Sequence, residues 1–372
     1  MDKYPQNTGT QEDLPPPIMH VGVAGWIRKN MLSSPTDVFL TVISIYILYE
    51  IVPPLANWVF FDAVFSGDVE HRNECREIAS GACWSVIVAR FEQLLYGFYP
   101  VHLRWRVNLT FILLFVALIP LLYDQVRGRK YLLWFTLIYP IFAFLMLWGG
   151  LGLESVESSK FGGFLLTVLI GVTGIAVSLP LGIALSLGRQ SSMPLMRLLS
   201  VCYIEFFRGV PLITLLFVAS TLLNYFMPPG TYFDLLLRVI IMVILFAAAY
   251  IAEVVRGGLA AIPRGQFEAA DALGLKYANC MRLIILPQAL KISIPGIVNT
   301  FIGLYKDTTL VVIVGLLDPL GISGATLADS RWQGLSTELY MFIALGFFIS
   351  CFAMSRYSLY LERKLDTGHK NQ

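Results

Sequence analysis

The sequence is poor in charge. Only 14% of its 372 residues are Asp, Glu, Lys or Arg, whereas 56% are hydrophobic. Soluble domains carry about 25% charged residues, so the composition excludes an ordinary water-soluble class. Several apolar runs of about 20 residues are long enough to cross the ~30 Å hydrocarbon core of a bilayer as helices. The short alternating segments of a membrane β-barrel are absent. We therefore predict an all-α polytopic membrane protein.

Cysteine is scarce as well. The five cysteines form no C-x-x-C pair, so we expect neither a metal site nor a thioredoxin-like site. Cys75 and Cys83 share a long loop that we place outside the membrane, where an oxidising envelope permits disulfides. They form a candidate disulfide. The alternative is two unpaired thiols in an interfacial helix.

Two further features are missing. The sequence has no G-x-x-x-x-G-K-[ST] phosphate loop, so any nucleotide chemistry must come from a partner chain. Many secondary transporters are built from an internal repeat, and this sequence has none. We expect no cofactor bound by this chain, no catalytic residue, and no nucleic-acid partner.

The apolar runs predict about eight spans. They cover residues 37–61, 108–123, 130–149, 161–188, 203–226, 235–254, 296–317 and 337–361. Most of the 27 lysines and arginines fall in alternate connecting segments, which the positive-inside rule places in the cytoplasm together with both termini. The first span follows Arg28 and Lys29 and runs into PPLANWVFF without a clear cleavage site, which predicts a signal anchor.

The chain divides near residue 155 on composition. We expect a cytoplasmic tail (1–35), an extension of three spans (36–155) with a periplasmic loop (62–107), a five-span core (156–365) and a short tail (366–372). The loop contains the aromatic run ACWSVIVARFEQLLYGFYP, which we expect to lie along the membrane surface.

A polar segment separates the sixth and seventh spans. It includes EAADALGLKYANCMRLIILP, from Glu268 to Pro287. Pro263 suits the first turn of a new short helix, and Gly274 can end that helix in the left-handed conformation. Glu268 and Asp271 place two carboxylates on one face of it. The segment predicts a cytoplasmic elbow that is too short and too charged to cross the membrane.

Glycine and proline residues also predict where the helices in and before this segment end. Gly257-Gly258 should end the sixth span near Val255, and a second short helix, Lys276 to Leu286, should end at Pro287. The elbow offers a slim surface for docking another protein. The alternative is an ordinary amphipathic loop helix whose charges are simply solvated.

The spacing of the elbow resembles a known signature. EAA, three residues, Gly, nine residues and I-x-LP is similar to the motif of permease subunits in binding-protein-dependent ABC importers. The resemblance implies that residues 263–278, approximately, form the coupling helix that inserts into a cleft of the ATPase. The coupling residues that it implies are Arg264, Gln266, Glu268, Ala269, Ala270, Asp271, Gly274 and Leu275.

Other stretches narrow the resemblance. YIEFFRGVPLITLLF, the segment around the elbow, and LPQALKISIPGIVNTFIGLYKDTTLV resemble the polar amino acid branch, over about residues 160 to 365. The extension, with GACW and GFYP, resembles one of the two unequal membrane subunits of the general L-amino acid uptake system. This implies a type I importer core of five helices plus three N-terminal helices, in a bacterial inner membrane. It also implies a second permease chain, two ATPases that bind ATP and Mg, a periplasmic binding protein and an L-amino acid substrate.

Charged and polar residues within the spans need an explanation, because each intramembrane charge costs about 2.5–3.5 kcal/mol on insertion scales. A zwitterionic amino acid requires an anionic group for its ammonium and a cationic or amide group for its carboxylate. The candidates for the substrate pathway are Arg208, Glu253, Asn299, Thr300, Lys306, Asp307 and Thr308. The alternative is that these residues pair with one another and lock helices together at the cytoplasmic end.

Two other functions compete with an ABC permease. An ion-coupled secondary transporter could use Asp307 and Glu253 as relays, but it would not need the elbow. A scaffold without transport would leave Lys306 and Asp307 unexplained. Many permeases of the polar amino acid branch carry an acidic residue where this chain has Thr300. Its absence argues against a site dedicated to basic amino acids.

Overall fold

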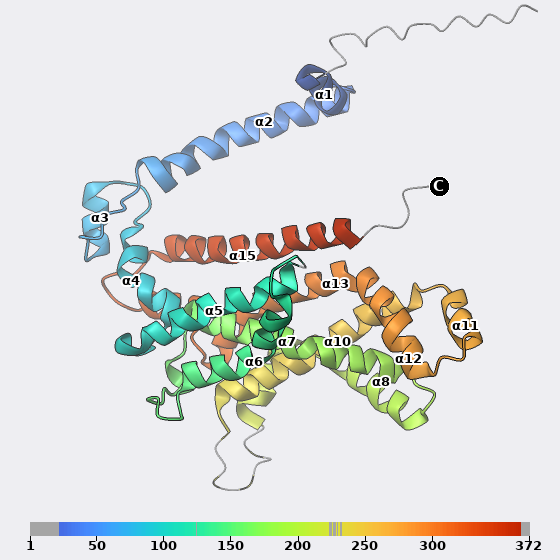
Figure 1. The fold of residues 1–372 in the computed structure, drawn as a ribbon. Helices are drawn as coiled ribbons and strands as arrows, with labels where there is room; N and C mark the ends of the chain where they lie inside the picture. The colour runs from blue at the N-terminus through green and yellow to red at the C-terminus, as the bar shows by residue number, and fades with distance from the viewer. Residues whose placement is uncertain are drawn as a thin grey trace, which may run out of the picture. The chain divides into compact units, whose positions relative to one another are not determined.

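The computed structural model describes residues 22–123, 125–222 and 233–365, together with residues 225, 228 and 230. Within these ranges every regular element is a helix (Figure 1). The predicted tails at residues 1–21 and 366–372 lie outside the described residues. The α-helices are α1 Gly22–Met31, α2 Pro35–Ala56, α3 Arg72–Ile78, α4 Ser85–Tyr96, α5 Arg104–Leu122, α6 Arg129–Trp148, α7 Gly163–Arg189, α8 Pro194–Gly209, α9 Leu212–Phe217, α10 Leu235–Ala260, α11 Arg264–Ala272, α12 Tyr277–Cys280, α13 Leu286–Asp307, α14 Pro319–Leu327 and α15 Ser336–Leu365.

The chain forms two compact units. The first comprises Met1–Phe65 and Asn73–Cys83, and the second comprises Ser66–Arg72 and Trp84–Gln372. In the first unit a disulfide joins Cys75 to Cys83, whose Cα atoms are 5.8 Å apart. The second unit holds α4 to α15, so the second and third predicted spans (α5 and α6) lie in the same unit as the five-span core.

The helices agree with a polytopic membrane protein. Among the described residues, six helices are long and apolar enough to cross a bilayer, and eight spans result if each of two bent pairs is counted as one. One bent pair is α6, whose halves meet at 47°. The other is α8 followed by α9 and a π-helical turn, Val218–Leu222.

This second bend corrects the predicted fifth span, 203–226. Instead of one straight helix, α8 and the segment after it meet at 101°. Pro211 explains the break, because the residue before a proline is disfavoured in the α conformation. Val210 is accordingly extended, with φ −111° and ψ 130°.

The core of the second unit is built around α7 and α10. Glycines on α7 let the helices approach closely: a Cβ on Gly182 would lie 2.9 Å from the backbone oxygen of Ala248, and one on Gly174 would touch Leu304 and Val243. Small residues serve this purpose in lipid, where hydrophobicity gives no association force. Helix α7 continues through Pro180 to Arg189.

The predicted end of the sixth span at Gly257-Gly258 is wrong. Helix α10 continues to Ala260 because Gly258 serves packing rather than termination. A Cβ there would lie 2.1 Å from Ser293 Oγ and 2.5 Å from the backbone oxygen of Ala289 on α13. The glycine is required where two helices cross.

The second short helix also differs from the prediction. It does not end at Pro287; α12 passes through a π-helical turn, Met281–Ile285, directly into α13. A proline removes one helical hydrogen bond and clashes with the preceding turn. Because Pro287 lies in the first turn of α13, right after the wider π turn, the helical path continues.

Helix α4, from the predicted periplasmic loop, packs on the core rather than only along the membrane surface. It contacts α7, α14 and α15. Backbone meets backbone where α4 ends: a Cβ on Gly163 would lie 2.1 Å from the Leu94 oxygen, and one on Gly97 would lie 2.4 Å from Gly162 Cα. Gly97 and Gly163 both have positive φ (64° and 60°), which only glycine adopts without strain.

Candidate functional site

The elbow is α11 with the turn that follows it, and it lies at one end of the core in Figure 1. Pro263 precedes the helix as its N-cap, one residue earlier than the predicted first turn. Gly274 has φ +72°, as the left-handed stop requires. The N–H of Leu275 donates to the Ala270 oxygen (3.1 Å) and the N–H of Gly274 to the Asp271 oxygen (2.9 Å). These two bonds form a Schellman cap.

The elbow has an inner face and an outer face. Ala270 is 1% exposed and packs with Phe267 and Leu275 on a cluster that includes Val255 and Ile285. Ala270 and Leu275, both in the predicted coupling set, therefore anchor the elbow to the core. The predicted coupling residues that face outward are Arg264, Gln266, Glu268, Ala269, Asp271 and Gly274.

Sequence reasoning missed one residue of this outer face. Leu273 has 77% of its surface exposed at the tip of the elbow, beside Gly274. Single exposed apolar side chains are ordinary on protein surfaces, so exposure alone gives Leu273 no role. Its place directly before the left-handed glycine puts it on the same outer face as the predicted coupling residues.

A cluster of five charged residues joins α7, α8 and α10. Glu253 Oε1 accepts from Arg256 on the same helix, and Glu253 Oε2 lies 3.5 Å from Arg189 Nη1 and 3.6 Å from Arg208 Nη1. Arg189 also bonds Glu205 at 2.9 Å. The structure thus brings together Arg208 and Glu253, two predicted pathway residues, and adds Arg189, which pairs with both Glu253 and Glu205. Their mutual pairing favours the helix-locking alternative for these two.

The other predicted pathway residues lie on α13 and the 3₁₀ turn after it, Thr308–Val314. Asn299 and Lys306 are exposed, and Asp307 is half-buried. Thr300 and Thr308 use their hydroxyls within the helix, donating to the backbone oxygens of Gly296 (2.9 Å) and Tyr305 (2.8 Å). Among the described residues, no ion pair joins this group to Glu253.

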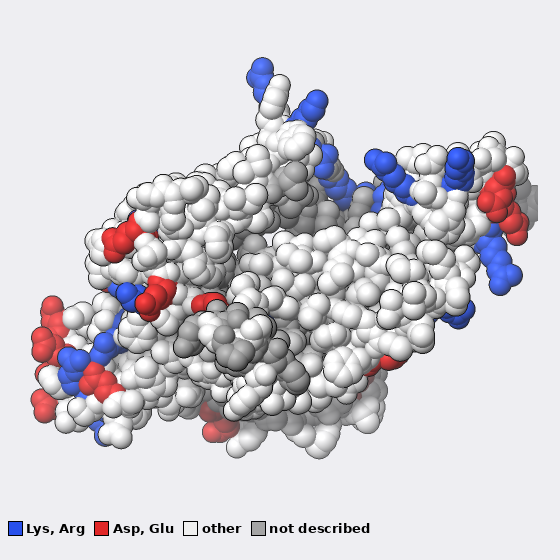
Figure 2. All heavy atoms as spheres, turned by 90° about the horizontal axis from the view of Figure 1, so that it is seen from below, with Lys and Arg blue, Asp and Glu red and all other residues white. Residues whose placement is uncertain are grey.

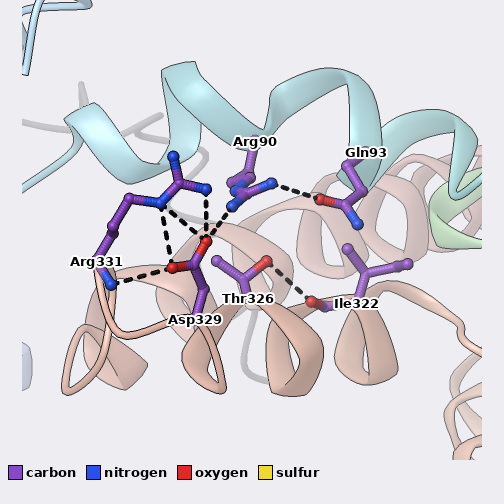
Figure 3. Close-up of polar contacts among 6 residues, drawn as sticks. All are labelled: Arg90, Gln93, Ile322, Thr326, Asp329 and Arg331. Atoms are coloured by element: carbon purple, nitrogen blue, oxygen red, sulfur yellow. Dashed lines mark hydrogen bonds and ion pairs between the residues drawn. The ribbon is translucent and has the colours of Figure 1, made fainter. Parts of the chain in front are cut away.

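A second polar cluster, which sequence reasoning did not single out, ties α4 to the turn after α14 (Figure 3). Arg90 Nη2 donates to Asp329 Oδ2 at 2.6 Å, and Arg331 Nη2 donates to the same oxygen at 2.8 Å. The hydrogen bonds from Arg331 hold the pKa of the Asp329 carboxyl at about 2, so it stays charged at any physiological pH. Arg90 also donates to Gln93 Oε1 (3.3 Å).

One buried acid lies at the other end of α14 from this cluster. Asp318 caps the N-terminus of α14, and its Oδ1 accepts from the Gly321 N–H at 2.9 Å. The side chain is fully buried, and its Oδ2 has no hydrogen-bond partner. Burial raises the pKa of this carboxyl to about 6.

The surface has the distribution of charged and apolar side chains that is typical of a membrane protein. On the face shown in Figure 2, most Lys, Arg, Asp and Glu gather at the left, along the top and at the right, and few charges lie on the broad surface between them. Many large apolar side chains of the described residues are exposed, for example Phe115, Ile141 and Phe348. Such a surface suits lipid and not water.

Comparison with known proteins decides the family. Residues 178–366 match the family of binding-protein-dependent transport system inner membrane components. The chain is also 49% identical to the glutamate/glutamine/aspartate/asparagine transport system permease protein BztC of Rhodobacter capsulatus, covering 96% of each chain. The chain belongs to this permease family. It is a multi-pass inner-membrane subunit of an amino acid ABC importer, without catalysis of its own.

Two other relatives place the permease within the family. It is 49% identical to the inner membrane amino-acid ABC transporter permease protein YhdY of Escherichia coli K12, over 92% of this chain and 93% of that protein. It is 32% identical to the probable glutamine ABC transporter permease protein GlnM of Bacillus subtilis, over 56% of this chain and 93% of that protein. Membership implies ATPase and binding-protein partners and no cofactor in this chain.

Proposed function

We propose that this permease forms half of a pathway for acidic amino acids and their amides, and that its elbow docks the ATPase. The substrate class is the one that the name of the relative BztC states. The observation that carries the coupling role is the outer face of α11, held rigid by the Schellman cap and by buried Ala270. The other half of the pathway is a second, related permease chain.

We further propose that both termini and the elbow face the cytoplasm. Two sets of contacts agree with the predicted grouping of segments on the two sides of the membrane, and the excess of Lys and Arg assigns one of these sides to the cytoplasm. Residues predicted on the inner side meet one another, as Arg189 meets Glu205. Residues predicted on the outer side do the same, as Arg90 meets Asp329 and Ser158 meets Asp234. A chain with one misplaced span between these residues would separate them.

Reconstitution tests the proposed function. The permease is co-expressed with its second permease and ATPase, purified, and placed in liposomes with the binding protein outside. ATP-dependent uptake of labelled glutamate should be inhibited by unlabelled glutamine, aspartate and asparagine, and not by lysine. Uptake driven by an ion gradient without ATP would contradict the proposal and favour a secondary transporter.

The identity of residue 300 should affect the substrate preference. A carboxylate at this position of α13 would attract a cationic side chain, which threonine cannot do. Thr300→Glu should therefore shift preference toward basic amino acids by roughly tenfold, equivalent to about 1.4 kcal/mol. Competition of glutamate uptake by arginine measures the shift, and Thr300→Ser, which keeps the hydroxyl, is the matched control. An unchanged competition profile would count against a substrate role of residue 300.

A further inference from the structure

Helix α8 is attached to the core along one side only. Ile204 is fully buried, and the Tyr203 hydroxyl donates to the backbone oxygen of Leu245 on α10 at 2.8 Å. Leu198 and Leu199, on the other side, are more than half exposed. The helix is therefore held to α7 and α10 through one face, and the side chains of its other face are largely exposed.

The bend after α8 is placed to serve as a hinge. Beyond it, Leu212, Leu215 and Leu216 of α9 are buried in the main hydrophobic core, which fixes that arm. At the bend itself, a Cβ added to Gly209 would meet no atom within 4 Å. Hinges are short segments that absorb backbone changes, and Gly209 at the bend has the room and the backbone freedom to do so, whereas Pro211 fixes the start of the next arm.

Among the described residues, the Arg208 side chain, directly before this hinge, is held by its ion pair with Glu253. Its Nη1 lies 3.6 Å from Glu253 Oε2, and Arg189 Nη1 lies 3.5 Å from the same oxygen. Both distances are longer than an ordinary N–H···O hydrogen bond, and this buried oxygen accepts no hydrogen bond. Ion pairs without directional hydrogen bonds can break and re-form after a small displacement of α8.

Glu253 also lies on the helix that leads to the elbow. Helix α10 runs on from Glu253 to Ala260, about two turns, and α11 follows at once. A displacement of the elbow is thus carried by a continuous helix to the carboxylate that holds Arg208. The same helix connects the ATPase docking face and the hinge.

We propose that Glu253 is a positioning residue of the transport cycle, which holds α8 in its resting position through Arg189 and Arg208. Movement of the elbow shifts Glu253 and releases Arg208, which lets the last turn of α8 move at Gly209, while Tyr203 and Glu205 keep the rest of α8 bonded to α10 and α7. The proposal rests on the proposed function, because it assigns the cluster a step between ATPase closure and opening of the pathway. Glu253 touches no substrate in this role.

The test uses the complete complex in lipid nanodiscs. ATP hydrolysis is measured without the binding protein and again with the binding protein plus glutamate. The stimulation ratio is the second rate divided by the first. Glu253→Gln should raise basal hydrolysis about fivefold and reduce the stimulation ratio toward one, because the resting position is no longer favoured. Glu253→Asp, which retains the charge, should restore most of the ratio. Arg197→Gln is the matched control, since Arg197 lies on α8 outside the cluster.

A wild-type ratio in assembled Glu253→Gln would overturn the proposal. If that variant fails to assemble, Arg208→Gln removes only one partner and should lower the ratio in the same direction by a smaller factor. A wild-type ratio in Arg208→Gln would then overturn it. Failure of the proposed function is distinguishable, because in that case the wild-type complex itself would show no stimulation by the loaded binding protein.

Discussion

Replacing Gly274 by valine is expected to reduce ATP-dependent uptake by more than about tenfold, with the amount of inserted protein unchanged. Gly274 has φ +72°, and the left-handed conformation costs an L-residue about 1–2 kcal/mol, more when the side chain is β-branched. About 1.4 kcal/mol already corresponds to a factor of ten. The Schellman bonds from Gly274 and Leu275 would be lost, and the outer face of α11 would no longer be held in place.

The open space around Gly274 excludes a steric clash as the cause of any effect. A Cβ at this position would meet no atom within 4 Å, so any effect comes from the backbone and not from a clash. Gly274→Asn is the matched control, because asparagine tolerates the left-handed conformation and should retain most of the uptake. Co-purification of the ATPase with each variant shows whether docking is the step that fails. Equal uptake by the valine and asparagine variants would contradict the proposed coupling role of this turn.

Replacing Asp318 by asparagine should remove a pH dependence of stability. The folded-state pKa of Asp318, about 6, lies above the unfolded value near 3.8. A carboxyl with a raised pKa contributes stability below the unfolded pKa, and this contribution is lost as the pH rises through about 6. Two pKa units correspond to about 3 kcal/mol, so the wild-type protein carries a penalty of this order at pH 8. Asparagine keeps the acceptor for the Gly321 N–H and carries no charge.

The measurement compares thermal inactivation of the two detergent-purified proteins at pH 5 and pH 8. Asp318→Asn should melt at a higher temperature than the wild type at pH 8, and this difference should shrink to about half at pH 5, because the penalty builds up between about pH 4 and pH 6. Other titrating groups cancel in this difference. Asp318→Ala, which loses the cap, should be less stable than Asp318→Asn at both pH values. Parallel pH profiles for the wild type and Asp318→Asn would show that Asp318 is not buried as described.

Features that depend on neighbouring residues were predictable from the sequence, whereas features that depend on residues far apart in the chain were not. The left-handed stop at Gly274 was predictable because it depends on a few neighbouring residues. The role of Gly258 was not, since the side chain that requires it, Ser293, lies 35 residues further along the chain. Local propensity treats such a glycine as a break, whereas tertiary packing uses it to bring two helices together.

The same limit applies to the candidate site. Arg208 and Glu253 were identified because charges are rare in membrane spans. Their partner Arg189 was overlooked because it ends its helix, where a basic residue is ordinary. Likewise, Arg90 and Asp329 are 239 positions apart, and nothing in either neighbourhood indicates that they meet. Sequence reasoning identified charged groups but could not pair them.

The contact between the end of α4 and the start of α7 has a consequence for how such permeases diversify. At this point the extension touches the core through main-chain atoms of Gly97, Gly162 and Gly163. A junction of this kind cannot be adjusted by gradual exchange of side chains, because any added Cβ collides with backbone. A chimaera that joins this extension to a shorter permease would therefore need glycine at all three positions. Without them the backbones of the extension and the core could not pack together.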